Sequence, residues 1–166
     1  MSEQLQQVLQ NQQQQKEKQD KPDKEEGIVQ LVCFMVDEEE FAVPILSIQE
    51  IIKPIETTRV PSTPDYVVGV FNLRGTVIPL IDLRLKFSRE KSAYNDDTRF
   101  IVIKNKNQRS GFVIDKLTEA IRLKESDIGS APESLGEEDN HIYGVGQRED
   151  RIVSILRIES ILKRTF

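Results

Sequence analysis

The sequence predicts a mainly β protein whose second half repeats the first. From residue 28 onward the apolar residues fall in short runs separated by Gly, Pro, Asn, Asp or charged turns, which is typical of strands. At an offset of 69, residues 30–34 align with 99–103 and residues 50–52 with 119–121. At an offset of 75, residues 67–70 align with 142–145 and residues 77–81 with 152–156. Closing each half into a small barrel is the simplest way to protect so many strand edges. From pattern alone, a chance alignment of two strand-rich halves stays equally open.

The first elements expected are a hairpin and a short helix. Residues 31–36 and 41–43 are apolar and flank the acidic turn at residues 37–40, which predicts two antiparallel strands. Pro44 then precedes isoleucines that fit one helical face, so we expect a short helix that ends at Pro54. These isoleucines are Ile45, Ile48, Ile51 and Ile52.

Residues 67–73 and 76–81 predict two strands joined by a tight turn, in which Gly75 supplies a positive φ and Arg74 projects from the tip. Both runs are apolar at nearly every position, so both faces need cover, from the core on one side and from something else on the other. Pro79 lacks an N–H, which favours an edge or a bulge. An apolar edge beside a basic turn indicates a docking surface. A merely solvated Arg74 is the simpler alternative.

The remaining elements follow in the same way. Asp82 is a plausible N-cap for a helical turn over residues 82–87. Later apolar runs predict two more hairpins and a terminal helix. The hairpins pair residues 100–103 with 111–114, around a tip at 105–108, and residues 142–146 with 152–156, and the helix contains Ile158, Ile161 and Leu162.

Residues 1–27 differ from the rest of the chain. They hold nine Gln and ten charged residues, and their only apolar members are Met1, Leu5, Val8 and Leu9. Such a segment cannot bury enough apolar surface to offset its ordering entropy, so we predict a disordered Gln-rich polar tail before a folded domain at residues 28–166. The spacing of Leu5, Val8 and Leu9 also matches one helical face, which a partner could induce.

Composition excludes several classes of protein. The chain has 166 residues, 23 Lys and Arg against 28 Asp and Glu, and a formal net charge of −5, which argues against a dedicated nucleic-acid binder. A single Cys (Cys33) and a single His (His141) provide neither a disulfide nor a zinc ligand set. The polar start does not resemble a secretory signal, and no apolar run is long enough to cross a bilayer, so we expect a cytoplasmic protein without direct membrane insertion.

Catalytic patterns are also missing from the sequence. The glycines at 75, 144 and 146 do not complete a phosphate-binding loop. His141 follows a polar stretch and is expected in an exposed loop, and Cys33 lies inside an apolar run and is expected to be buried. We therefore expect no enzyme activity, no catalytic or metal-binding residues and no cofactor.

The segment from Gly69 to Gly75, continuing through residues 78–84, closely resembles the signature of the bacterial chemotaxis coupling protein family, the CheW-like domains. Residues 45–51 resemble the early helix motif of this family, and residues 111–115 its mid-chain hairpin. Residues 143–146 and 158–162 resemble its C-terminal part. The resemblance covers about residues 28–166 in family order.

This resemblance implies two SH3-like five-stranded β-barrel subdomains with short connecting helices, packed around a shared apolar centre. It also implies a non-catalytic adaptor or scaffold that couples chemoreceptor cytoplasmic tips to the histidine kinase CheA, through the CheW-like regulatory domain of CheA. Such a protein works in the cytoplasm at membrane-associated receptor arrays. A CheW-like adaptor for a non-chemotaxis two-component pathway is the alternative.

The resemblance also suggests binding residues. Arg74 matches the arginine associated with receptor contact, Gly69 and Gly75 shape the backbone around it, and Ile48 and Glu50 lie in the helix motif associated with the same contact, although core packing equally explains an isoleucine. Ile78, Pro79 and Ile81 are the candidates for the kinase contact.

Overall fold

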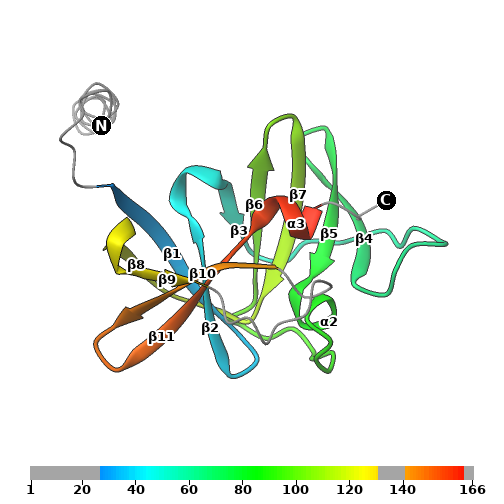
Figure 1. Ribbon diagram of the computed structural model, residues 1–166. Helices are drawn as coiled ribbons and strands as arrows, with labels where there is room; N and C mark the ends of the chain where they lie inside the picture. The colour runs from blue at the N-terminus through cyan, green and yellow to red at the C-terminus, as the bar shows by residue number, and fades with distance from the viewer. Residues whose placement is uncertain (1–26, 131–140, 163–166) are drawn as a thin grey trace.

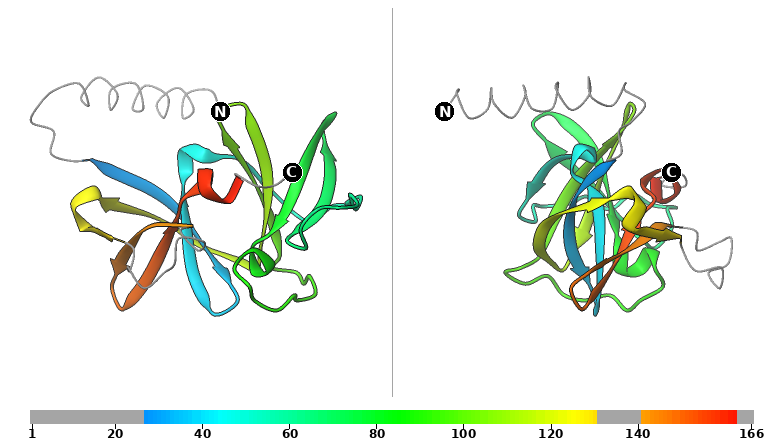
Figure 2. Two further views of the ribbon diagram at one scale, coloured as in Figure 1. Left: turned by 45° about the vertical axis from the view of Figure 1, so that its right-hand side comes forward. Right: turned by 60° about the vertical axis from the view of Figure 1, so that its left-hand side comes forward.

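The computed structural model describes residues 27–130 and 141–162, and strands dominate this part of the chain. They form a six-stranded sheet and a five-stranded sheet that lie side by side (Figures 1 and 2). The mainly β prediction is therefore confirmed. The predicted tail lies almost wholly outside the described residues, so its disorder stays a prediction.

The elements follow one another along the chain in two similar series. The first series is β1 (Ile28–Val36), β2 (Glu39–Pro44), η1 (Ile45–Ser47), β3 (Ile48–Ile52), β4 (Val67–Leu73), β5 (Thr76–Asp82) and α2 (Leu83–Lys86). The second series is β6 (Arg99–Asn105), β7 (Gln108–Ile114), β8 (Lys116–Lys124), η2 (Glu125–Asp127), β9 (Ile128–Ser130), β10 (Ile142–Arg148), β11 (Arg151–Leu156) and α3 (Ile158–Leu162). All four predicted hairpins are present.

The repeat is confirmed by the order of strands in the two sheets. The six-stranded sheet runs β8-β1-β2-β11-β10-β9, and the five-stranded sheet runs β3-β6-β7-β5-β4. Strands that align in sequence hold matching places, because β1 corresponds to β6, β3 to β8, β4 to β10 and β5 to β11. The helices match too, since α2 and α3 follow β5 and β11 at the same offset of 75 residues.

The expectation that each half of the chain closes on itself is wrong. Each sheet takes one hairpin from the other half of the chain: β1 and β2 join β8 and β11, whereas β6 and β7 join β3 and β5. The exchanged hairpins are attached by parallel pairing, of β2 with β11 and of β7 with β5. This exchange makes the halves interdependent, because neither sheet is complete without strands from both.

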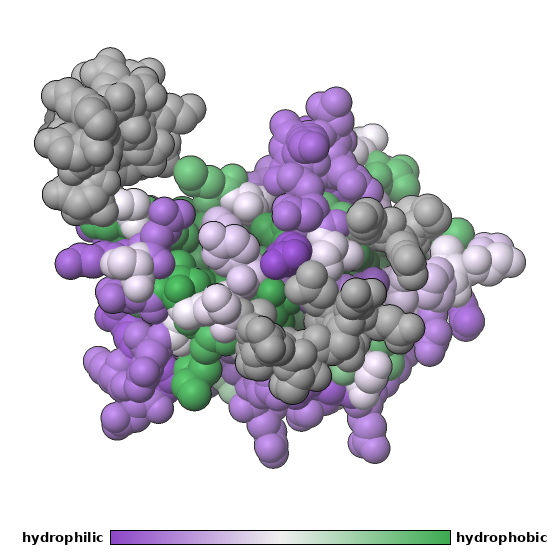
Figure 3. Space-filling model, viewed as in Figure 1, coloured by the Kyte–Doolittle hydropathy of each residue, from purple (hydrophilic) through white to green (hydrophobic). Residues whose placement is uncertain are grey.

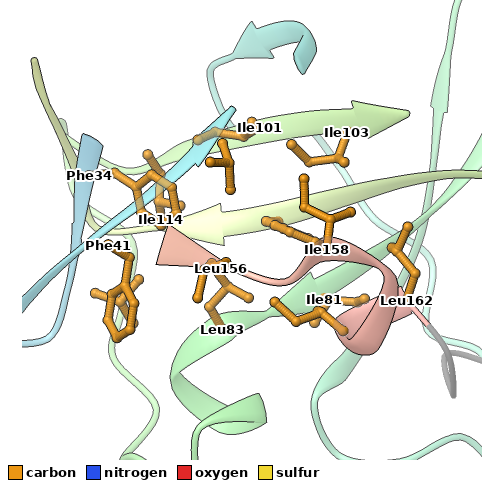
Figure 4. Close-up of a cluster of buried hydrophobic side chains, with 14 residues drawn as sticks. Phe34, Phe41, Ile81, Leu83, Ile101, Ile103, Ile114, Leu156, Ile158 and Leu162 are labelled. Atoms are coloured by element: carbon orange, nitrogen blue, oxygen red, sulfur yellow. The ribbon is translucent and has the colours of Figure 1, made fainter. Parts of the chain in front are cut away.

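Within residues 27–130 and 141–162, three apolar cores explain why so many strands are apolar on both faces. The largest lies between the sheets and includes side chains from both sheets and from α3 (Figure 4). Two smaller cores belong to one sheet each. Along β6, Ile101 and Ile103 face the shared core, while Phe100 and Val102 face the core of the five-stranded sheet. For β6 the cover on the second face is therefore a second core of the same chain, whereas Val77 on β5 is 63% exposed.

The helix expected between Pro44 and Pro54 is mostly a strand. Only Ile45–Ser47 form a 3-10 turn, and Ile48–Ile52 form β3, which pairs antiparallel with β6. The isoleucine spacing fits either structure over so short a stretch. Pairing with β6 decides for the strand, because it satisfies the backbone and lets Ile48 and Ile52 reach different cores.

Asp82 caps α2 as expected. Its side chain accepts a hydrogen bond from the backbone N–H of Arg84 at 2.9 Å. Burial raises the pKa of the Asp82 carboxyl above its usual value, although the backbone N–H groups of α2 favour the charged form. The cap fixes where β5 ends and where the chain turns away from the sheet.

Candidate functional site

Arg74 projects from a two-residue turn between β4 and β5. Arg74 has φ 52° and Gly75 has φ 86°, and a tight hairpin turn with two positive φ values matches the twist of the flanking strands. The side-chain oxygen Oδ1 of Asn72 accepts a hydrogen bond from the Gly75 N–H at 2.9 Å, which holds the turn. The Arg74 side chain is 75% exposed as a result.

Arg74 and Glu50, both predicted from the resemblance, meet in a two-pronged ion pair. Nη1 of Arg74 lies 2.7 Å from Oε1 of Glu50, and Nη2 lies 2.9 Å from Oε2. Glu50 is on β3 and Arg74 follows β4, and these are the two outer strands of the five-stranded sheet. The ion pair therefore joins the two ends of a curled sheet, and it holds the guanidinium in one orientation with much of its surface open to solvent.

Next to this ion pair, β3 offers an open strand edge. Among the described strands its only neighbour is β6, so its other edge has unpaired backbone groups. Ile48 is half-buried against the shared core, and Leu46, just before β3, is 81% exposed. An oriented cation, an unpaired strand edge and apolar side chains thus lie close together, which suits a protein partner better than a small molecule.

Gly69 is buried and acts on the backbone. A Cβ atom at this position would lie 2.2 Å from the carbonyl oxygen of Thr58, and Gly69 has φ 154°. Because Gly69 has no Cβ atom, Thr58 can pair with Val70 through two backbone hydrogen bonds of 2.7 and 2.8 Å. The glycine therefore shapes β4 and does not itself offer a contact surface.

The candidates for the kinase contact differ in exposure. Ile78 is 1% exposed and Ile81 is fully buried, whereas Pro79 is half-buried. Strand β5 as a whole lies between β4 and β7, but the part that contains Pro79 pairs with β4 alone, and a bulge in β4 follows at Val67/Gly69. The missing N–H is tolerated because pairing with β7 begins only at Leu80. A partner approaching β5 would meet Pro79 and the 63% exposed Val77 before the buried isoleucines.

The six-stranded sheet has a matching ion-pair cluster that sequence reasoning missed. Glu119 on β8 pairs with Arg151, and Nε of Arg148 lies 3.6 Å from the same carboxylate. Arg151 also reaches Glu40, with 3.3 Å between Nη1 and Oε1. The alignment of residues 50–52 with 119–121 already placed Glu119 over Glu50, and this signal could have identified the cluster.

The structure places Cys33 and His141, the two side chains that the sequence singled out as familiar catalytic types, in packed surroundings. Cys33 is fully buried, and desolvation raises its thiol pKa to about 12, so it stays protonated at neutral pH. His141 is half-buried rather than exposed as predicted: its Nδ1 lies 2.7 Å from Oγ of Ser160, and its ring packs against Phe87. Within residues 27–130 and 141–162, no cluster of three His, Cys, Asp or Glu could hold a metal ion.

Membrane-spanning helices are likewise not found among the residues that the structure describes, since none there is both long and apolar enough.

Comparison with known proteins identifies close relatives. The family model described as CheW-like domain matches residues 30–166. The chain is 50% identical over 166 residues to the chemotaxis protein CheW of Helicobacter pylori, covering 100% of both chains. It is 33% identical over 136 residues to the chemotaxis protein CheW of Bacillus subtilis, covering 81% of this chain and 87% of the relative. The crystal structure of the scaffolding protein TtCheW from Thermoanaerobacter tengcongensis is similar, with a TM-score of 0.73, 27% identity and coverage of 80% of this chain and 86% of that one.

Proposed function

Because the chain belongs to the CheW-like domain family, we propose that it is a chemotaxis adaptor that couples chemoreceptor cytoplasmic tips to the histidine kinase CheA. The observation that carries this proposal is the 50% identity to a chemotaxis protein CheW over the full length of both chains. The adaptor works in the cytoplasm at membrane-associated receptor arrays, and it gives the receptors control over kinase activity through contact rather than through a reaction of its own.

The receptor contact is proposed at the Arg74–Glu50 ion pair and the adjoining edge of β3. An arginine held by a two-pronged ion pair loses little conformational freedom on binding, which favours it as an interface anchor. Its remaining N–H groups can donate to carboxylates or backbone carbonyls of a helical receptor tip. Ile48 supports β3 from the core side, and Gly69 and Gly75 set the shape of the backbone around the arginine.

The kinase contact is proposed on the end of the five-stranded sheet that contains β5. Of the three candidates Ile78, Pro79 and Ile81, only Pro79 is partly exposed and can contact the kinase directly. The two isoleucines are buried and stabilise the strand that carries it. Val77, 63% exposed on the same strand, extends this surface. Two separate contact surfaces on one curled sheet let the adaptor bind receptor and kinase together.

The experiment that tests this function is reconstitution with a CheA kinase and a chemoreceptor cytoplasmic fragment. Kinase autophosphorylation should become receptor-dependent when this protein is added, and Arg74→Glu should weaken capture by the receptor fragment by at least about tenfold, as expected for an anchor arginine. Arg122→Glu, an equal charge change at an exposed position on β8, is the matched control and should bind normally.

Two results would contradict the proposal. Receptor capture by Arg74→Glu at the wild-type level would remove Arg74 from the contact. Binding to neither the kinase nor the receptor fragment would refute the chemotaxis function, and binding to a different histidine kinase alone would favour the alternative adaptor role.

A further inference from the structure

The two hairpins that the sheets exchange end in matching turns of opposite charge. Both the β1–β2 turn and the β6–β7 turn have two residues, and the first residue of each has a similar backbone, with φ 60° at Asp37 and φ 58° at Lys106. Residues 37–40 are all acidic, whereas residues 104–109 contain three cations and no acid. The two turns lie at opposite ends of the molecule (Figures 1 and 2), and Figure 3 shows hydrophilic surface (purple) at both ends. Because the same turn tolerates either charge, formation of the hairpin does not explain the cations.

Most carboxylates of the β1–β2 turn are neutralised within the chain. Arg89 binds two of them, with 3.4 Å between its Nη1 and Oδ2 of Asp37 and 2.5 Å between its Nη2 and Oε1 of Glu39. Arg151 binds a third, with 3.3 Å between its Nη1 and Oε1 of Glu40. These ion pairs explain the acidic turn by contacts inside the molecule.

The cations of the β6–β7 turn lack such partners in the described part of the chain. Lys104 and Lys106 are exposed and Arg109 is half-buried, and none of the three forms an ion pair there. Lys104 lies directly opposite Arg109 across the hairpin, and like charges in that position are destabilising. The equivalent pair on the first hairpin is Met35 with Glu40, which carries a single charge. The β6–β7 turn therefore keeps a repulsion that an anion from outside the chain can relieve.

These cations lie at the same end of the five-stranded sheet as Arg74. Val102 belongs to the core of this sheet, and side chains alternate along β6, so Lys104 lies on the same face nearer the end of the strand. Strand β5 pairs parallel with β7, which places the turn that contains Arg74 at the same end as the β6–β7 turn. We call Arg74, Lys104, Lys106 and Arg109 the basic rim.

We propose that the basic rim binds carboxylates of the receptor tip. This inference rests on the proposed function, and it names the chemistry of the partner at that contact. The rim includes Arg74, the proposed anchor, and Lys104 lies on β6, which pairs with β3 and so adjoins its open edge. Cations without a partner in the chain gain from carboxylates through charge-assisted hydrogen bonds and faster encounter. A second copy of this chain fits less well, because most carboxylates of its β1–β2 turn already bind arginines.

The test measures binding of full-length variants to a chemoreceptor cytoplasmic fragment. Lys104→Gln/Lys106→Gln removes two cations of the rim, and its affinity should be about three- to tenfold weaker than that of wild type at low salt. The difference should vanish at about 0.5 M NaCl, because salt screens exposed charges. Arg122→Gln/Lys124→Gln removes two exposed cations of β8 and should bind as wild type does.

A stability measurement excludes misfolding as the cause of weaker binding. Lys104→Gln/Lys106→Gln relieves the repulsion between Lys104 and Arg109, so urea unfolding should show it to be at least as stable as wild type. A purely structural role for these lysines predicts the opposite, a loss of stability with unchanged affinity, and that result would overturn the inference.

The remaining outcomes separate the possible partners. Equal receptor affinity of wild type and Lys104→Gln/Lys106→Gln at low salt would overturn the inference, while the receptor contact at Arg74 stands. Weaker capture by the CheA kinase with unchanged receptor affinity would overturn it in favour of a kinase contact. A wild-type dimer that dissociates in the variant, again with unchanged receptor affinity, would overturn it in favour of a second copy. Wild type that captures no receptor fragment would refute the proposed function itself, and this inference with it.

Discussion

Gly69 and Gly144 occupy the same place in the two sheets, each where another segment crosses a strand too closely for a side chain. A Cβ at Gly69 would lie 2.2 Å from the carbonyl oxygen of Thr58, and a Cβ at Gly144 would lie 2.8 Å from that of Gly129. Thr58 pairs with β4 as Gly129 of β9 pairs with β10. The two halves of the chain therefore also repeat the close backbone contact that the missing side chain of each glycine permits.

Gly69→Ala should destabilise the protein by at least about 2 kcal/mol, for two reasons. The new methyl group must push the Thr58 backbone away, and the φ of residue 69 is one that alanine rarely adopts. Urea unfolding at neutral pH measures the change. Gly129→Ala is the control, since its Cβ would meet its nearest neighbour, the Val145 carbonyl oxygen, at 3.7 Å. Equal stability of Gly69→Ala and wild type would contradict the close approach.

The Arg74–Glu50 pair should matter for binding and hardly for stability. Arg74 is 75% exposed, so the pair contributes at most about 1 kcal/mol to folding. Arg74→Glu is expected to shift the unfolding free energy by no more than that. The exchanged variant Arg74→Glu/Glu50→Arg restores the ion pair without restoring the cation at the turn. Normal receptor capture by the exchanged variant would show that receptor binding depends on the ion pair between the ends of the sheet and not on the cation at the turn.

Asp115→Ala should cost about 1–3 kcal/mol, because this carboxylate joins both sheets. It accepts hydrogen bonds from Nη2 of Arg84 at 2.6 Å and from the Asp37 N–H at 2.6 Å. The pair with Asp115 raises the pKa of Arg84, so its loss leaves a partly buried cation. Chemical denaturation measures the cost.

Glu119→Ala is the comparison for Asp115→Ala, since Glu119 binds two arginines whereas Asp115 binds one arginine and a backbone N–H. Those arginines are 39% and 41% exposed, against 19% for Arg84. The expected cost is therefore below about 1 kcal/mol. A larger loss for Glu119→Ala than for Asp115→Ala would contradict the role given to burial.

Alkaline pH should destabilise the protein partly through Cys33. Burial raises the pKa of its thiol from 9.0 to about 12, so between these values the folded chain keeps a proton that the unfolded chain releases. The contribution of Cys33 to stability is thus present below pH 9 and is lost as pH rises toward 12. Unfolding free energies from pH 8 to 10.5 should fall more steeply for wild type than for Cys33→Ala. Parallel slopes would contradict the shift.

The four hairpins and the Asp82 cap could be read from sequence because each depends on residues close together in the chain. Strand β3 was expected as a helix, and β8 was not expected. The motifs that contain Arg74 and Glu50 were found through resemblance. Their ion pair was not, because it depends on how the ends of a sheet come together. The burial of Ile78 and Ile81 was missed for a similar reason, since an apolar strand looks the same whether a partner or a second core covers its other face.

The sequence by itself determined that the chain is mainly β and that it resembles the CheW-like domains, and its pattern alone left the repeat open. Only the tertiary structure decided which strands belong together. Residues 48–52 became a strand because β6 lay available to pair with them, and the hairpins β1–β2 and β6–β7 each joined the sheet of the other half. The local sequence pattern predicts which residues face inward, but not which of the apolar cores they join. Here that depends on packing in the core shared by the two sheets.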